Sequence, residues 1–266
     1  MNHITDAEFR QFQRFIYEAA GISMAPSKKA LICGRLAKRL RKHQLDSYSD
    51  YFRLLQSGEA PGEAQVAVDL LTTNETYFFR EPRHFDLLRK LATEAGGNAS
   101  TFRVWSAASS TGEEAYSIAM VLADCLPAAS WEVVASDISS RVLEAARRGH
   151  YVRERTTHIP SDYLKRFCLK GTGPQEGTVL IDRSLRSRVK FVQVNLNEPL
   201  PSLGLFDVVF LRNVMIYFDT ETKRSVVARV TSLLKRGGHL LVGHSETLNS
   251  LCDGLQTRAP SIYRRM

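Results

Sequence analysis

The feature that most constrains the fold is an alternation of apolar and helical segments after about residue 100. The stretch TFRVWSAA (101–108) has the pattern of a strand, and GEEAYSIAMVLADCL (112–126) has that of a helix. WEVVASD (131–137) and SSRVLEAARRG (139–149) repeat this pair. Further along the chain come RVKFVQVNL (188–196), FDVVFLRN (206–213), a helical TETKRSVVARVTSLL (220–234) and GHLLVGHS (238–245). The alternation predicts a doubly wound parallel sheet, which binds ligands beyond the carboxyl ends of its strands.

The first part of the chain has a different pattern and is predicted to be helical. TDAEFRQFQRFIYEAAG (5–21) begins with a Thr/Asp cap, spaces its phenylalanines at helical intervals and stops at a glycine. Three more segments fit helices: PSKKALICGRLAKRLRKHQL (26–45), SYSDYFRLLQSG (47–58) and GEAQVAVDLLTT (62–73). We expect a small all-helical N-terminal domain plus linker over residues 1–85, and an α/β domain with a Rossmann-like sheet over residues 86–266.

The strand and helix pattern is interrupted over about residues 151–188. This interruption contains KGTGPQEGTVLID (170–182), in which three glycines and a proline mark tight turns and TVLID reads as a strand. We therefore expect a small antiparallel β-subdomain inserted into the α/β domain.

The charge and the cysteines limit the partners and the compartment. A formal net charge of +8 favours an acidic partner: nucleic acid, an anionic membrane or an acidic protein surface. The four cysteines are far apart and form no CxxC pair, which argues against a zinc site or disulfides and favours a reducing cytoplasm. No apolar run is long enough to cross a bilayer, and the N-terminus lacks the apolar core of a signal peptide. We expect a soluble, cytoplasmic protein without membrane insertion.

The loop after the first strand, WSAASSTGEEAY (105–116), is the first candidate binding site. Its small residues let a ligand approach the backbone, and a helix N-terminus follows. It contains only Gly112 and is not GxGxxG, so a nucleoside without a pyrophosphate, such as S-adenosylmethionine, fits better than a dinucleotide. Glu114 has two interpretations. It completes a capping box with Thr111, or its carboxylate meets a cationic cofactor.

Polar residues also follow two later strands. Asp137 stands where Rossmann-like sheets bind ribose hydroxyls, although it could instead cap the helix that starts near Ser139. Arg212 and Tyr217 follow another strand and are difficult to explain as core, because arginine is almost never buried unpaired. Core packing is the better interpretation for three of their neighbours, Met215, Ile216 and Phe218.

Two histidines near the end of the chain raise the question of a metal. His239 and His244 flank one strand, and a lone pair at this spacing is not a convincing metal site. We expect no metal. No GxSxG, HExxH or Walker sequence occurs.

Several segments together resemble the bacterial chemotaxis-receptor glutamate methyltransferases, the CheR family. They are TTNETYFFRE (72–81), VWSAASSTGEEAYSIA (104–119), ASDISSRVLEAARRG (135–149), FLRNVMIYF (210–218) and GGHLLVGHSE (237–246). The resemblance runs in order along nearly the whole chain. It implies methyl transfer from S-adenosylmethionine to glutamates of chemoreceptor cytoplasmic domains in chemotaxis adaptation, with S-adenosylhomocysteine as product. It also implies a helical domain before the cofactor-binding domain.

The resemblance also assigns site residues. For the cofactor it implies Asn74, Thr76, Arg80, Glu114, Asp137, Asn195, Leu196, Arg212 and Asn213. It places Arg80 and Tyr217 at the active site, where we expect Arg80 to orient the substrate carboxylate and Tyr217 to donate a supporting hydrogen bond. Phe78 and Phe79 are expected to anchor this segment by packing.

Two surfaces are candidates for receptor binding. Arg35, Lys38, Arg39 and Lys42 share one helical face and could dock on acidic receptor helices, although a solvated surface explains such a basic run equally well. KGTGPQEG (170–177) resembles the glycine-bearing β-subdomain of family members that bind a receptor C-terminal pentapeptide, although its glycines could be turn residues only. No segment argues for a dimer, and we expect a monomer.

Two other functions are compatible with parts of this sequence. The basic charge permits a nucleic-acid methyltransferase, but RNVMIYF stands where an NPPY-type base-flipping motif would be expected, so we expect no nucleic-acid partner. A cofactor-binding regulatory or scaffold protein with little catalysis is the second alternative. The presence of Asn74, Arg80, Asp137, Arg212 and Tyr217 argues against it.

Overall fold

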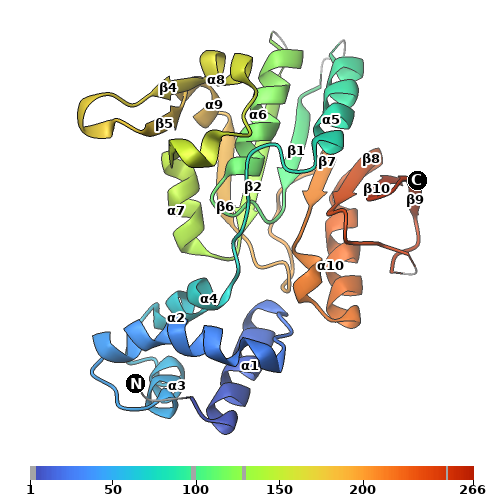
Figure 1. The fold of residues 1–266 in the computed structure, drawn as a ribbon. Helices are drawn as coiled ribbons and strands as arrows, with labels where there is room; N and C mark the ends of the chain where they lie inside the picture. The colour runs from blue at the N-terminus through green and yellow to red at the C-terminus, as the bar shows by residue number, and fades with distance from the viewer. Residues whose placement is uncertain (1–3, 97–99, 128–129, 250) are drawn as a thin grey trace.

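The computed structural model describes residues 4–96, 100–127, 130–249 and 251–266. Figure 1 shows an all-helical part and a sheet-containing part that are joined by an extended segment, the linker (72–81). None of the helices in these ranges combines the length and apolar character needed to span a bilayer.

The N-terminal part is a bundle of helices around an aromatic core. Its elements are α1 (Asp6–Ala20), η1 (Pro26–Lys28), α2 (Lys29–Lys42), α3 (Tyr48–Ser57) and α4 (Glu63–Leu71). Helix α1 begins at a capping box between Thr5 and Glu8 and ends at Gly21, whose φ of 70° is the left-handed conformation typical of a helix C-terminus. Phe12 is fully buried, and its ring lies 6.2 Å from that of Tyr51. The predicted helical domain is confirmed.

The second part is built on a seven-stranded sheet with the order β6-β2-β1-β7-β8-β10-β9. The strands are β1 (Phe102–Ser106), β2 (Trp131–Asp137), β6 (Val189–Gln193), β7 (Phe206–Leu211), β8 (Leu234–Val242), β9 (Leu255–Ala259) and β10 (Ile262–Arg265). The first five pair in parallel, and β10 is antiparallel to β8 and β9. The chain leaves β1 toward β2 and later returns to its other side as β7, so a topological switch point lies between β1 and β7.

Helices cover both faces of this sheet, as the sequence predicted. They are α5 (Pro82–Ala95), α6 (Glu113–Cys125), α7 (Ser140–Arg148) and α10 (Thr220–Ser232). In β1, Val104 joins the core formed with α5 and α6, whereas Trp105 joins the core formed with α10. This alternation of side chains buries both faces, which is the usual state of a parallel sheet.

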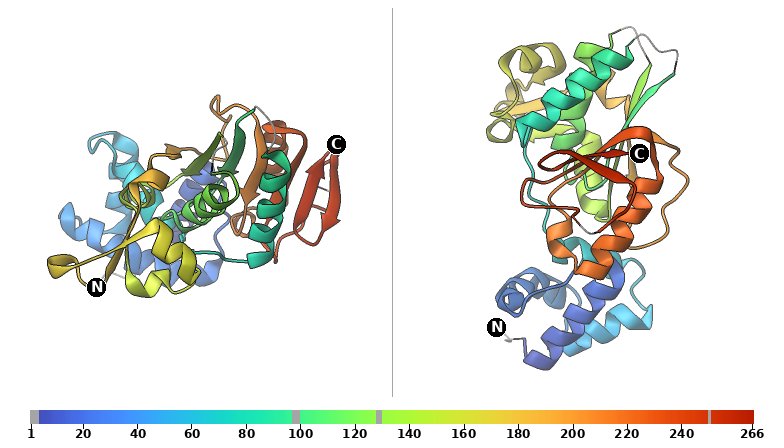
Figure 2. Two further views of the ribbon diagram at one scale, coloured as in Figure 1. Left: turned by 90° about the horizontal axis from the view of Figure 1, so that it is seen from above. Right: turned by 90° about the vertical axis from the view of Figure 1, so that its right-hand side faces the viewer.

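The predicted insertion is a separate three-stranded antiparallel sheet with the order β3-β5-β4. It comprises β3 (His150–Val152), η2 (Arg153–Thr156), α8 (Ser161–Phe167), β4 (Cys168–Lys170), η3 (Gly173–Gln175) and β5 (Thr178–Ile181), and α9 (Arg183–Arg186) leads back to β6. Figure 2 shows the insertion at one end of the large sheet and the β9–β10 hairpin at the other. The α/β fold with an inserted β-subdomain is confirmed.

Two features lie outside what the sequence predicted. The short strands β9 and β10 were not expected. The boundary predicted between residues 85 and 86 falls inside α5, and the buried Phe85 and Leu88 of this helix belong to the core of the sheet.

Candidate active site

A cavity lies at the carboxyl ends of the central strands, where the extended segment crosses from the helical part to the sheet. It contains all ten predicted cofactor-binding and catalytic residues: Asn74, Thr76, Arg80, Glu114, Asp137, Asn195, Leu196, Arg212, Asn213 and Tyr217. These residues come from the linker, α6, and the ends of β2, β6 and β7. The position agrees with the rule that doubly wound sheets bind ligands at the switch point.

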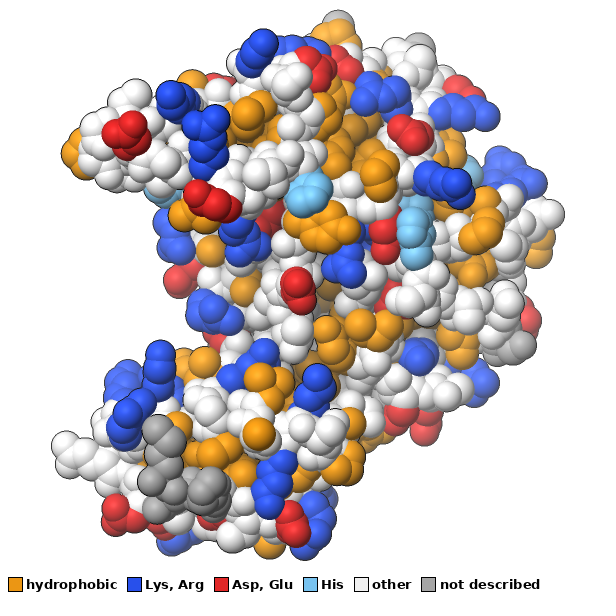
Figure 3. Space-filling view, viewed as in Figure 1, with side chains coloured by type: hydrophobic (Ala, Val, Ile, Leu, Met, Phe, Trp, Pro, Cys, Tyr) orange, Lys and Arg blue, Asp and Glu red, His pale blue; other side chains and the backbone are white. Residues whose placement is uncertain are grey.

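The helical part also contributes to the cavity, which the sequence did not predict. Ala20 and Ile22 line it from the end of α1 and the loop that follows. Ile22 forms a β-bridge with Phe218, and the Asn195 side chain donates 2.7 Å to the carbonyl of Ala19. These contacts fix the helical part as one wall of the site. Figure 3 shows basic side chains on both sides of the hollow between the two parts.

Asp137 ends β2 and is almost fully buried. One carboxylate oxygen accepts the N–H of Ser110 at 2.9 Å and the other accepts the N–H of Ser139 at 3.0 Å. Burial raises the pKa of Asp137 to about 6, although these hydrogen bonds favour the ionised form. The interpretation of Asp137 as a helix cap is wrong, because α7 is capped by the hydroxyl of Ser139, which accepts from the N–H of Val142.

Glu114 does not form the capping box that Thr111 and its spacing suggested. Gly112, not Thr111, occupies the N-cap position of α6, and the Thr111 hydroxyl donates to Glu113 at 2.7 Å. The Glu114 carboxylate turns toward the sheet instead. There it accepts from the Ser106 hydroxyl at 2.7 Å and from Arg212 at 3.0 Å. Burial raises the pKa of Glu114, and the nearby Arg212 opposes the rise.

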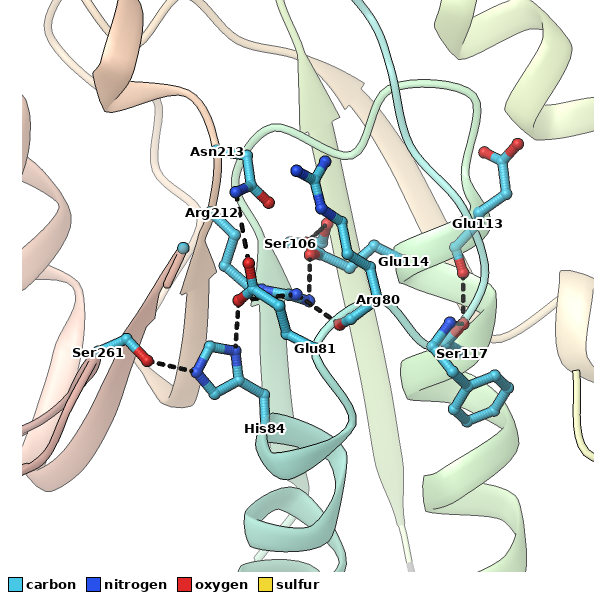
Figure 4. Close-up of polar contacts among 12 residues, drawn as sticks. Arg80, Glu81, His84, Ser106, Glu113, Glu114, Ser117, Arg212, Asn213 and Ser261 are labelled. Carbon is cyan, nitrogen blue, oxygen red and sulfur yellow. Dashed lines mark hydrogen bonds and ion pairs between the residues drawn. The ribbon is translucent and has the colours of Figure 1, made fainter. Parts of the chain in front are cut away.

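Arg212 is buried and joins two carboxylates (Figure 4). Its guanidinium lies 3.0 Å from Glu114 and 3.1 Å from Glu81, and it donates to the carbonyl of Arg80. Burial would raise the pKa of Glu81, but Arg212 and the backbone N–H of His244 outweigh it and lower the pKa. Arg212 is therefore a fixed cation at the floor of the site. As expected, it is not an ordinary core residue, because its charge is paired with Glu81 and Glu114.

Two acidic residues that organise this site were not predicted. Glu81 has a φ of 60°, uncommon for a residue before proline, and accepts from Asn213 as well as Arg212. Glu246 is buried and accepts the N–H groups of Asn213 at 2.8 Å and Ile216 at 3.2 Å. The partners that draw these two residues into the site, Arg212, Asn213 and Ile216, are distant in the sequence, so local spacing does not mark the contacts.

The segment after β7 carries Tyr217 on a short 3-10 helix, η4 (Met215–Tyr217). Met215 and Phe218 are buried, as predicted, but the core prediction for Ile216 is wrong, since half of its surface is exposed. The carbonyl of Tyr217 accepts from the N–H of Ser23 at 2.8 Å, which attaches the segment to the helical part.

Arg80 differs from Arg212 in its surroundings. Its guanidinium donates to the carbonyl of Glu75 at 3.4 Å and lies 5.6 Å from the centre of the Tyr77 ring. Within the described residues it has no ion-pair partner. The site thus contains one cation neutralised by carboxylates and another that is available to an anionic ligand.

The donor and acceptor groups of the cavity fit S-adenosylmethionine. The Asp137 oxygens accept N–H bonds from Ser110 and Ser139, and a carboxylate has about four lone-pair positions, which leaves acceptor capacity for a hydroxyl of the ligand. Ala107 and Ala108 leave room beside the end of β1, while Val194 and Leu196 provide apolar surface for a base.

The predicted docking face on α2 is divided by the structure. Arg35 donates to the carbonyls of Leu71 at 3.2 Å and Thr72 at 2.9 Å, and Arg39 pairs with the buried Glu63. These two arginines therefore bind within the helical part. Lys38 and Lys42 are exposed and have no acidic partner among the described residues.

Three potential metal ligands lie close together beside the Arg212 network. Glu81, His84 and His244 place one potential ligand atom each within 4.8 Å of one another. The guanidinium of Arg212, however, lies 3.1 Å from the same Glu81 carboxylate and would repel a divalent ion. We interpret the cluster as part of the Arg212 ion-pair network.

Comparison with known proteins identifies the family of the chain. The family model for the SAM-binding domain of CheR methyltransferases matches residues 74–262, and the model for their all-alpha domain matches residues 7–72. The chemotaxis protein methyltransferase of Escherichia coli (strain K12) is 43% identical, with 98% of this chain and 91% of that protein covered. Chemotaxis protein methyltransferase 2 of Pseudomonas aeruginosa is 44% identical, with 98% and 94% covered.

More distant likeness extends to other methyltransferase structures. The glycopeptide N-methyltransferase MtfA with sinefungin is 19% identical, with a TM-score of 0.37 over 74% of this chain and 62% of that one. The two family models and the full-length relatives decide the classification. The chain belongs to the CheR family of S-adenosylmethionine-dependent methyltransferases.

Proposed function

We propose that this enzyme methylates glutamate side-chain carboxylates of chemoreceptor cytoplasmic domains and forms glutamate methyl esters. The observation that carries the proposal is Arg80, a cavity-lining cation without an ion-pair partner among the described residues. The other cavity-lining arginine, Arg212, is already neutralised by Glu81 and Glu114. A substrate carboxylate provides the negative partner that the Arg80 guanidinium lacks. The cytoplasm, where receptor signalling domains lie, is the proposed compartment, and a monomer is the proposed state.

The chemistry needs alignment more than proton transfer. A glutamate side chain is ionised at neutral pH, so its oxygen attacks without a general base. S-adenosylmethionine, when bound, would supply the electrophilic methyl group, and S-adenosylhomocysteine, a neutral thioether, would be the product. Arg80 holds one carboxylate oxygen, which leaves the other oxygen free to react, and the Tyr217 hydroxyl supports this orientation. Alignment of this kind can contribute several kcal/mol to catalysis.

The remaining cavity residues are proposed to hold the cofactor. Asp137 accepts hydrogen bonds from the ribose, and Glu114 lies near the amino-acid end. Asn195 and Leu196 contact the adenine. The linker residues Asn74 and Thr76, together with Asn213, complete the cavity wall, and Arg212 keeps the carboxylates in place.

The test is replacement of Arg80 by alanine. Arg80→Ala should lose most receptor methylation, because the substrate carboxylate is no longer held, whereas affinity for S-adenosylhomocysteine should fall much less. Arg83→Ala is the matched control, since Arg83 is an exposed arginine three residues away that does not line the cavity. Near-normal methylation by Arg80→Ala would refute the assignment.

A receptor tether at the insertion is the second part of the proposal. Strand β4 is an edge of the β3-β5-β4 sheet, and half of the surface of Leu169 on this strand is exposed. An extended C-terminal peptide can add to such an edge through main-chain hydrogen bonds. Titration calorimetry with receptor C-terminal pentapeptides tests this proposal. Absence of measurable heat at millimolar peptide would argue against a tether.

A further inference from the structure

The inserted subdomain packs against the linker that lines the active site. It contacts each of the three aromatic residues of this linker. Between ring centroids, Tyr77 lies 4.9 Å from His158, Phe78 lies 5.1 Å from Tyr151, and Phe79 lies 5.9 Å from Tyr163. Phe78 is completely buried, which confirms its predicted anchoring role. The linker residues that line the cavity are therefore held from behind by the insertion.

One side chain of the insertion adds a polar connection. Arg155, on η2, pairs with the carboxylate of Glu113, whose side chain is fully buried. The same guanidinium donates to the Thr111 hydroxyl at 3.2 Å and to the Thr76 carbonyl at 3.4 Å. A single arginine thus joins the linker to the loop that follows β1.

That loop is tightly connected to the cofactor-binding carboxylate. The Ser110 N–H donates to Asp137, and its hydroxyl donates to the Asn74 carbonyl at 2.9 Å. The hydroxyl of Tyr151, again from the insertion, donates to the Thr111 carbonyl at 2.8 Å. A displacement of the loop would therefore move the groups that meet the ribose.

We propose that Arg155 is a positioning residue of the cofactor site, through which the inserted subdomain sets the placement of Thr76 and of the loop before α6. The inference rests on the proposed cofactor roles of Thr76 and Asp137. Arg155 does not line the cavity itself, and it acts through Thr76 and Thr111. The insertion is then a structural part of the cofactor site as well as a candidate receptor contact.

A simpler role for Arg155 must be distinguished from this one. A buried carboxylate without its cation is strongly destabilising, so Arg155 could serve only to neutralise Glu113. The variant pair Arg155→Met and Arg155→Met/Glu113→Gln separates the two roles. The double variant removes the unpaired charge but does not restore the contacts to Thr76 and Thr111. Arg155→Lys is a second test, because it keeps the positive charge and loses the forked geometry.

The readouts are the melting temperature of the ligand-free protein and the Kd for S-adenosylhomocysteine by calorimetry. Arg155→Met should lower the melting temperature and raise Kd roughly tenfold, which is the size expected for loss of charged hydrogen bonds. In the double variant the melting temperature should recover while Kd stays raised, and Arg155→Lys should also show a raised Kd. Arg153→Met, an exposed arginine on the same turn, is the control and should match the parent chain.

Each outcome decides between the two roles. A parent-like Kd in both the double variant and Arg155→Lys would overturn the positioning role. If the double variant fails to fold, Arg155→Lys alone decides by the same criterion. Failure of the parent chain to bind S-adenosylhomocysteine would instead reject the proposed cofactor site itself.

Discussion

Cofactor affinity should depend on pH through Asp137, because this carboxylate titrates near physiological pH. Burial raises its pKa to about 6, and the ribose hydroxyls need it as an ionised acceptor. At pH 5 only about one molecule in eleven would carry the charge, so Kd should be about tenfold larger than at pH 7, a difference of about 1.4 kcal/mol. Binding at pH 6 should release up to about half a proton.

The raised pKa of Asp137 affects the stability of the ligand-free chain in the opposite direction: low pH weakens cofactor binding but favours folding. The pKa of Asp137 is raised from 3.8 to about 6, so the folded state binds its proton more tightly than the unfolded state. This contribution is fully present below pH 3.8 and is lost as the pH rises through 6. Its size is about 3 kcal/mol. Cofactor binding therefore favours the ionised form of Asp137, whereas burial in the ligand-free fold favours the protonated form.

The assay is calorimetric titration with S-adenosylhomocysteine from pH 5 to pH 8, in buffers of different ionisation enthalpy to count protons. Asp137→Asn should bind more weakly and with a flatter pH profile. This comparison isolates Asp137 from Glu113 and Glu114, whose pKa values are also raised by burial. Equal Kd values at pH 5 and pH 7, or an unchanged profile in Asp137→Asn, would refute the reasoning.

The remaining predictions concern stability and receptor binding. Gly112→Ala should lower the free energy of unfolding, measured in urea, by about 2 kcal/mol or more. The φ of Gly112 is 96°, and a Cβ added there would lie 2.9 Å from the Cβ of Ala146. Gly58→Ala should cost less, because φ is also positive there but an added Cβ would meet no other atom within 4 Å. Glu81→Gln should destabilise by about 3 kcal/mol, because buried Arg212 loses one of its two carboxylates, and an unchanged urea midpoint would contradict this. Lys38→Glu/Lys42→Glu should raise KM for the receptor and leave the Kd of S-adenosylhomocysteine unchanged; unaltered receptor kinetics would exclude this surface.

The sequence predicted the sheet well, because it follows from local patterns. The residues predicted for the site, several of them from the family resemblance alone, line one cavity. Strand ends in a doubly wound sheet converge on one edge, so Asp137 and Arg212 could be placed together although they are distant in the chain. The β9–β10 hairpin was missed because its strands are short and β9, LQTRA, is mostly exposed. It lacks the apolar run that marks the other strands.

The errors concern pairings between distant residues, both at the site and on the predicted docking face. Thr111 and Glu114 have the spacing of a capping box, but Arg212, 98 residues away, binds the Glu114 carboxylate instead. Helical periodicity placed Arg35 and Arg39 on one face with two lysines. It could not show that α4 presents carbonyls and Glu63 to these two arginines. Local spacing identifies candidates, whereas tertiary partners decide which of them remain free.

The most direct test of the proposed function is transfer of labelled methyl from S-adenosylmethionine to chemoreceptor-containing membranes. We expect label in the receptor and its release as volatile methanol on treatment with base, because a glutamate methyl ester is base-labile. Absence of transfer to receptor, or label that resists base, would contradict the account.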